Sequence, residues 1–359
     1  MTRLKLLATL AAGAALAGAA ALVVPGALAD EPQPFAGDRQ VTVMTRNLYL
    51  GTDLAPLFAA PTPFGLVAAV GVGWQQVQAN DFSVRAEALA DEISLAQPDL
   101  VGLQEASLYR TDSPPDGPAT PAETAALDFL GLLLDALADR GLAYEPVSIF
   151  TGTDIELPAG LPPALDVRLT DRVVVLARTD EKTADLKLSN PRSGAFPTAL
   201  TVTTAAGPLT LPRGWASVDV KIRGKQFRFV VTHLEAFSQP VRNAQAGELL
   251  AGAAATDLPV VLVGDLNSGP GSDLGAYTML RDNGFADAWA GGSGLTCCHA
   301  ADLREQDATL TTRIDLVLTR GGFETVSVDV VGDDPADRTP PGLWPSDHAG
   351  VVATVQLPD

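Results

Sequence analysis

The stretch LPVVLVGDLNSGPGS, residues 258–272, is the most informative in the chain. Its apolar run is typical of a buried strand, and it ends at once on Gly264 and Asp265, with Asn267 two positions further on. Asp, Asn, Ser, Gly and Pro are also the ordinary residues of turns, so the segment alone fits either a simple turn or a functional strand end. Residues two apart on an extended chain face the same side, which predicts that Asp265 and Asn267 address one common group.

The same kind of ending recurs along the chain. Groups able to bind a metal ion or a phosphate follow or lie within other apolar runs: Asn47, Glu105, His233 and Asp315, and then the cluster SDH of residues 346–348. Strand ends hold side chains rigidly, as a hydrolytic site requires. The recurrence therefore favours one site built from many strand ends over unrelated turns.

Composition sets the class of the protein. The chain has 359 residues, of which 47% are hydrophobic and 19% charged, as in globular domains. Its formal net charge of −19 repels nucleic acid and anionic lipid at long range. This charge counts against a non-enzymatic nucleic-acid binder, although a cleft filled by a metal ion could still engage a phosphate.

The N-terminus is typical of an exported protein. Arg3 and Lys5 precede a stretch rich in Ala, Leu and Gly at residues 6–24, and the pattern Ala-Leu-Ala ends at Ala29. We predict a secretory signal peptide over residues 1–29, cleaved after Ala29, and a secreted mature protein. The alternative is an uncleaved membrane anchor, because the apolar stretch is near spanning length.

Residues 30–359 show neither an internal repeat nor a low-complexity linker, which predicts a single domain. Helices are expected over residues 64–96, in two pieces broken near Asn80 and Asp81, and over residues 120–140 and 241–254. Strands are expected at residues 39–50, 98–105, 171–177, 216–222, 227–232, 259–264, 313–318 and 350–355. Such a mixture predicts a layered α/β or α+β domain.

The chain's only cysteines, Cys297 and Cys298, are adjacent. Across a trans peptide their Cα atoms lie about 3.8 Å apart, closer than an ordinary disulfide allows. Two free thiols, a strained vicinal disulfide and a metal site completed by His299 are the alternatives.

The motifs TRN, QE, THL, GDLNS, RID and SDH occur in this order over residues 41–357. This set resembles the endonuclease/exonuclease/phosphatase superfamily, which includes deoxyribonuclease-I-like nucleases, abasic-site endonucleases, inositol polyphosphate phosphatases and neutral sphingomyelinases. The resemblance implies a four-layer α/β (α+β) sandwich, in which two packed mixed β-sheets are flanked by helices. It also implies an Mg²⁺-dependent phosphoric ester hydrolase whose site lies where the strand ends meet.

The resemblance assigns metal ligands. Glu105 would be the main ligand of Mg²⁺, with Asn47 and Asp347 beside it, and Mg²⁺ prefers such oxygen donors. Mn²⁺ and Ca²⁺ are alternative ions. The structural alternative for Glu105 is a carboxylate at an exposed strand end.

It also assigns roles around the phosphate. Asp265 would orient or deprotonate the attacking water, and Asn267 would donate to a phosphoryl oxygen. Arg213 is a candidate to bind the phosphate, since a guanidinium fits phosphate oxygens, but an ordinary surface arginine is an equal alternative.

The histidines complete the expected site. His348 with Asp315 looks like the family's His–Asp pair, which would stabilise the transition state or protonate the leaving oxygen. His233 would bind a second phosphoryl oxygen. A hydrogen-bonded core histidine is the alternative for both, and His299 lies outside the matched motifs.

These expectations favour a secreted phosphodiesterase that acts on nucleic acid by direct attack of water, as a monomer without a stable protein partner. The 24 Lys and Arg residues and the 6% aromatic content are sparse for a nuclease. The alternatives are a lipid phosphodiesterase of the sphingomyelinase or phospholipase C type, a phosphomonoesterase, and a catalytically silent binding module on the same fold.

Overall fold

The computed structural model describes residues 39–160, 162, 164–289, 291 and 294–358. The predicted signal peptide lies outside these residues, so its cleavage after Ala29 stays a prediction. Within the described part, no helix is long and apolar enough to cross a membrane.

The larger sheet has eight strands in the order β15-β16-β1-β2-β6-β3-β4, with β5 paired to β6. Strand β1 runs parallel to β2 and antiparallel to β16, so the sheet is mixed. Its strands are β1 (Gln40–Asn47), β2 (Leu100–Gln104), β3 (Leu108–Asp112), β4 (Thr124–Asp128), β5 (Tyr144–Ala159), β6 (Leu165–Arg178), β15 (Glu324–Val331) and β16 (Gly350–Gln356).

The second sheet has six strands in the order β13-β14-β12-β11-β10-β7, and it is mixed because β11 and β12 run parallel. Its strands are β7 (Lys187–Ala195), β10 (Gly214–Ile222), β11 (Lys225–His233), β12 (Val260–Asp265), β13 (Ala286–Asp287) and β14 (Asp315–Arg320). A separate hairpin joins β8 (Leu200–Thr204) to β9 (Gly207–Leu211).

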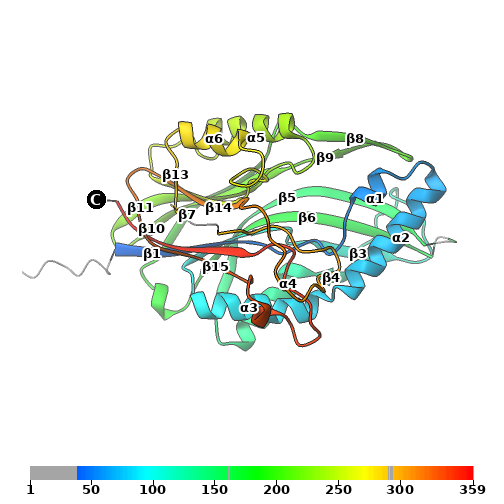
Figure 1. Ribbon diagram of the computed structural model, residues 1–359, viewed down its shortest axis with the longest axis horizontal. Helices are drawn as coiled ribbons and strands as arrows, with labels where there is room; N and C mark the ends of the chain where they lie inside the picture. The colour runs from blue at the N-terminus through cyan, green and yellow to red at the C-terminus, as the bar shows by residue number, and fades with distance from the viewer. Residues whose placement is uncertain (1–38, 161, 163, 290, 292–293, 359) are drawn as a thin grey trace, which may run out of the picture. The chain divides into compact units, whose positions relative to one another are not determined.

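Helices cover the outer face of each sheet (Figure 1). Apolar residues of α2 (Pro63–Ala79), α3 (Phe82–Ala96) and α4 (Phe129–Asp139) form one core with the larger sheet. Those of α5 (Gln239–Ala251) and α6 (Gly275–Asp282) form another with the second sheet. The short helix α1 (Ala55–Phe58) and the 3-10 turns η2 (Glu181–Thr183) and η3 (Pro335–Asp337) lie in connections. The predicted four-layer sandwich is confirmed.

The two sheets face each other across a core of their own. In β12, Val261 and Val263 point into this inter-sheet core, whereas Val260 and Leu262 point towards α5 and α6. Burial on both faces explains why the strand is a continuous apolar run instead of an alternating one. Close approach of the sheets requires Gly102 in β2, because a Cβ atom there would lie 2.4 Å from Cγ2 of Val263.

Most predicted elements are present, and the predicted break near Asn80 and Asp81 separates α2 from α3. The predicted helix over residues 120–140 is wrong in its first half. Residues 124–128 form β4, which pairs antiparallel with β3, and the helix begins only at Phe129. Of the leucines at helical spacing, Leu127 lies within β4 and the others lie beyond this point. Residues 124–128 satisfy their backbone groups in the sheet instead.

Candidate active site

Strand register in the second sheet places three predicted residues side by side. His233 at the end of β11 is paired with Asp265 at the end of β12, and Asp265 is paired with Asp315 at the start of β14. All three are almost completely buried. Residues far apart in the sequence thus meet at one edge of the sheet, as the strand endings predicted.

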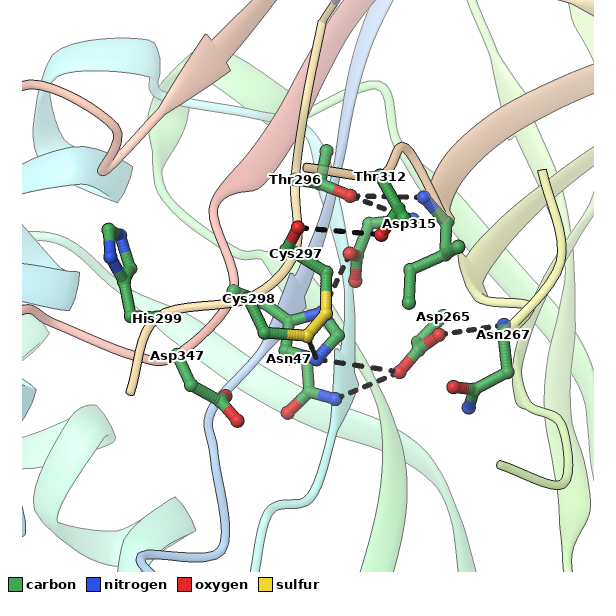
Figure 2. Close-up of a disulfide and its surroundings, with 12 residues drawn as sticks. Asn47, Asp265, Asn267, Thr296, Cys297, Cys298, His299, Thr312, Asp315 and Asp347 are labelled. Atoms are coloured by element: carbon green, nitrogen blue, oxygen red, sulfur yellow. Dashed lines mark hydrogen bonds and ion pairs between the residues drawn. A yellow bond between two sulfur atoms is a disulfide. The ribbon is translucent and has the colours of Figure 1, made fainter. Parts of the chain in front are cut away.

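The larger sheet contributes its strand ends to the same place. Asn47 ends β1 beside Gln104, and Glu105 follows directly. The Asn47 amide Nδ2 donates to Oδ2 of Asp265 at 3.2 Å, across the boundary between the sheets (Figure 2). The site therefore lies where the two sheets meet.

Carboxylates gather on the Asn47 side of the site. Burial, followed by the charges of Asp347 and Asp171, raises the pKa of Glu105 to about 8. Burial also raises the pKa of Asp347. Buried acids that repel one another become ionised readily only beside a cation. These two carboxylates and the Asn47 oxygen, which accepts the Tyr49 N–H at 2.9 Å, are a donor set that fits a hard divalent ion.

His348 forms the predicted pair with Asp315. Its Nδ1 lies 2.7 Å from Oδ2 of Asp315, and its Nε2 lies 3.9 Å from Oδ2 of Asp265. Burial lowers the pKa of His348, but the carboxylates of Asp315 and Asp347 outweigh this effect and raise the pKa well above its ordinary value. His348 is thus protonated at neutral pH, with Nε2 facing the site.

Asp265 lies at the centre of the site. Its Oδ1 accepts the backbone N–H of Asn267 at 2.8 Å, and burial followed by the charge of Asp315 raises its pKa to about 7. The prediction of an extended chain from Asp265 to Asn267 is wrong, because Asn267 has φ of +48° and the two residues form a side-chain-to-backbone turn. The Asn267 Nδ2 donates to the carbonyl oxygen of Leu234 at 3.0 Å.

Arg213 contacts His233. Its Nη1 lies 3.0 Å from Nδ1 of His233 and 3.2 Å from Oδ2 of Asp171. A guanidinium only donates, so Nδ1 of His233 accepts and the ring proton resides on Nε2, which lies 3.3 Å from Oδ2 of Asp265. Burial and the charge of Arg213 lower the pKa of His233 well below its ordinary value, so this ring is neutral. The role of Arg213 as a direct phosphate ligand stays a prediction. Its guanidinium contacts His233 and Asp171.

Sequence reasoning missed several buried charges behind the site. Asp171 lies in β6 just before the apolar run of residues 173–177, and it pairs with Arg213. Arg46 forms a buried pair with Glu92 at 2.8 Å and donates to the carbonyl oxygen of His348. The available signal was a charged residue close to an apolar run, before it for Asp171 and after it for Arg46.

Arg85, on helix α3, was also missed. It is fully buried, and its guanidinium donates to the carbonyl oxygens of Leu48 at 2.7 Å and Pro345 at 3.0 Å. It therefore connects the segment after Asn47 to the segment before Asp347, which stabilises the relative position of two predicted metal ligands. Its place among the apolar residues of a helix was the available signal.

The cysteines form a vicinal disulfide, Cys297–Cys298, at the edge of the site (Figure 2). A metal site that includes His299 is contradicted, because this ring stacks on Trp344 with centroids 4.0 Å apart and points away from the sulfurs. Instead, Cys298 Sγ lies 3.9 Å from Nε2 of His348.

The sequence matches the Endonuclease/Exonuclease/phosphatase family over residues 70–348. Among curated proteins, none matches this chain. One similar solved structure is an endonuclease/exonuclease/phosphatase family protein from Bacteroides thetaiotaomicron, with 16% identity, a TM-score of 0.55, and coverage of 88% of this chain and 94% of the other.

Two further structures are alike in fold. A mannosyl-6-phosphatase from Bacteroides thetaiotaomicron has 16% identity and a TM-score of 0.54, over 88% of this chain and 99% of the other. TDP2 from D. rerio, complexed with single strand DNA product, has 16% identity and a TM-score of 0.52, over 88% and 98%. At such identities the likeness shows the fold alone.

The family match agrees with the site. Enzymes of this family typically depend on a divalent metal, and Asp265, Asp315 and His348 place donor atoms within 4.8 Å of one another, close enough for one metal ion. The chain therefore belongs to the endonuclease/exonuclease/phosphatase family and is a hydrolase of phosphoester bonds.

Proposed function

We propose that this enzyme is an Mg²⁺-dependent phosphodiesterase in which water attacks the phosphorus directly. The observation that carries the proposal is the position of Asp265. It lies between a neutral histidine, His233, and a protonated one, His348, beside the half-buried carboxylates of the Asn47 side. Asp265 as the base and His348 as the acid are thus held side by side in one site.

Each residue has a role that follows from its protonation. Mg²⁺, held by Glu105, Asp347 and Asn47, would supply Lewis-acid stabilisation of the charge on a phosphoryl oxygen. Asp265, once ionised, accepts the proton of the attacking water.

The remaining groups act on the phosphoryl and leaving oxygens. Nε2–H of His348 donates to the oxygen on which charge develops, while Asp315 keeps the ring protonated and oriented. The Asn267 amide has a second N–H besides the one given to Leu234, and this one is available to a phosphoryl oxygen.

The charges of the site favour a diester over a monoester. A phosphate monoester carries up to about two negative charges at neutral pH, whereas a diester carries one. The guanidinium of Arg213 contacts His233. The same guanidinium pairs with Asp171, and its Nε lies 3.9 Å from Oε2 of Glu235. Its positive charge is largely compensated, so the site suits the less charged ester.

Nucleic acid is the substrate that we propose first. The test is nicking of supercoiled plasmid by the purified mature protein, with Mg²⁺ and with a chelator, beside the Asp265→Asn variant to exclude a contaminating nuclease. Metal-dependent nicking that is lost in the variant supports a nuclease. An intact plasmid together with release of phosphocholine from choline-phospholipid vesicles would instead support the lipid phosphodiesterase.

We also propose that the enzyme is exported, because residues 1–29 have the pattern of a signal peptide. Expression in a bacterial host, followed by N-terminal sequencing of the protein from the culture medium, tests this. A chain that begins at Asp30 is expected. Retention of residues 1–29 in the membrane fraction would support the anchor instead.

A further inference from the structure

The segment that carries Cys297 and Cys298 is fixed against His348 by its backbone. Cys297 forms isolated β-bridges with both Thr312 and His348. The N–H of His299 donates to the carbonyl oxygen of Asp347 at 2.8 Å. The two sulfur atoms are therefore held at the edge of the catalytic site by contacts that do not depend on the bond between them.

Three donor atoms converge at this edge. The Sγ atoms of Cys297 and Cys298 and a ring nitrogen of His348 lie within 4.8 Å of one another. Asp315 engages Nδ1 of His348, so Nε2 is the nitrogen that faces the sulfurs. A carboxylate that holds one ring nitrogen orients the other for a metal ion. Cys298 is exposed to solvent, which provides a route of entry.

We propose that reduction of the Cys297–Cys298 disulfide creates a site for a thiophilic divalent cation such as Zn²⁺, with the two thiolates and Nε2 of His348 as ligands. Two sulfurs and one imidazole leave a fourth, open position in the tetrahedral geometry that Zn²⁺ prefers. This donor set differs in kind from the oxygen ligands of Glu105, Asp347 and Asn47, so the two sites select different ions.

The reaction that opens the site needs a reductant, and a water-soluble phosphine serves. The phosphine gives two electrons to the disulfide and takes its oxygen from water, which yields the phosphine oxide and two thiols. On binding, each thiol releases its proton to solvent and each sulfur donates a lone pair to the metal. Nε2 of His348 likewise releases its proton to solvent and binds the metal through the lone pair that this frees.

Occupation of this site has a consequence for the proposed function. A metal-bound Nε2 carries no proton, so it cannot donate to a phosphoryl oxygen. The reduced enzyme should therefore lose Mg²⁺-dependent turnover when Zn²⁺ is added, while the oxidised enzyme keeps it. This consequence rests on the proposed function, whereas the binding itself does not.

The test measures binding separately from turnover. The purified protein is prepared oxidised and phosphine-reduced, the reductant is removed, and each form competes with a chromogenic chelator for Zn²⁺. We expect one Zn²⁺ per reduced chain that is absent from the oxidised chain, and Co²⁺ should give a thiolate charge-transfer absorption only in the reduced form. Cys298→Ser should abolish the difference, and the neighbouring His299→Ala should keep it.

Equal binding of Zn²⁺ by the two forms would overturn the proposal, because it would place the ion on carboxylates such as Asp265 and Asp315. A reduced chain without bound metal would overturn it as well. If the binding difference is found but no phosphoester is hydrolysed, the proposed function fails and the metal site stands. If Zn²⁺ binds as expected but leaves turnover of the reduced enzyme unchanged, the proposed role of Nε2 of His348 in turnover is wrong and the metal site stands.

Discussion

Asn47 and Asp265 end strands of different sheets and share a hydrogen bond of 3.2 Å. The bond exists only while the sheets are packed together, since β1 and β12 are not neighbours in either sheet. The geometry of the site therefore depends on the core between the sheets. A substitution in that core should alter the site's geometry and lower turnover.

Gly102→Ala tests this dependence. The added Cβ would lie 2.4 Å from Val263 and 2.8 Å from Val231, so the sheets must separate locally. We expect a loss of about 1–3 kcal/mol of unfolding free energy, measured by urea denaturation, together with reduced turnover. Gly247→Ala on α5 is the matched control, because its Cβ meets only Sδ of Met279 at 3.8 Å. That change should stabilise the helix by about 0.5–1 kcal/mol. Unchanged stability of Gly102→Ala would contradict the packing described here.

Glu105→Gln should abolish turnover without unfolding the protein. The neutral amide relieves repulsion with Asp347 and Asp171, so stability without Mg²⁺ should be retained or increased. A metal that binds only the folded state raises its melting temperature, and this effect of Mg²⁺ should disappear in the variant. Glu145→Gln, at an exposed position of β5, is the control and should behave as the parent does. Normal turnover of Glu105→Gln would exclude its role as the main ligand.

The dependence of kcat on pH should be bell-shaped. Turnover needs Asp265 ionised, so it rises with pH through the pKa of Asp265, which is about 7 without the cation and lower beside it. Turnover also needs His348 protonated, so it falls as pH passes the raised pKa of His348. Asp315 raises both pKa values, so Asp315→Asn should move both limbs to lower pH.

An alkaline limb that stays in place in Asp315→Asn would show that His348 does not control it.

Substitution of His348 itself by Ala should cost about 3 kcal/mol of transition-state stabilisation, on the scale of one lost oxyanion donor. A loss of turnover below about tenfold would instead favour a structural histidine.

Arg213→Met should remove the contact that keeps the ring proton of His233 on Nε2. Without the guanidinium, Nδ1 is no longer bound to accept, and the loss of a positive charge raises the pKa of His233. We expect kcat to fall by about tenfold or more, and nitrogen NMR to show a proton no longer confined to Nε2. Arg140→Met, which removes a surface pair with Glu87, is the control. A variant with the parent's tautomer and kcat would contradict the positioning role.

Features set by local sequence patterns could be predicted, whereas features set by tertiary contacts could not. Asn47, Glu105 and Asp265 could be predicted because each follows or ends an apolar run, and His348 because it lies just before one; such patterns are local. The pairing of Arg213 with His233 could not, because it depends on the register of β10 and β11. Strand β4 could not be predicted for the same reason, because its backbone partner, β3, is a tertiary contact.

Hydrolysis of bis-para-nitrophenyl phosphate and of para-nitrophenyl phosphate, with Mg²⁺ and with a chelator, shows whether the enzyme is an Mg²⁺-dependent phosphodiesterase with Asp265 as its base. The parent enzyme should hydrolyse the diester only with Mg²⁺ and should prefer it to the monoester, and Asp265→Asn should lose this activity while remaining folded. Hydrolysis that persists in the chelator, or that Asp265→Asn retains in full, would contradict the account.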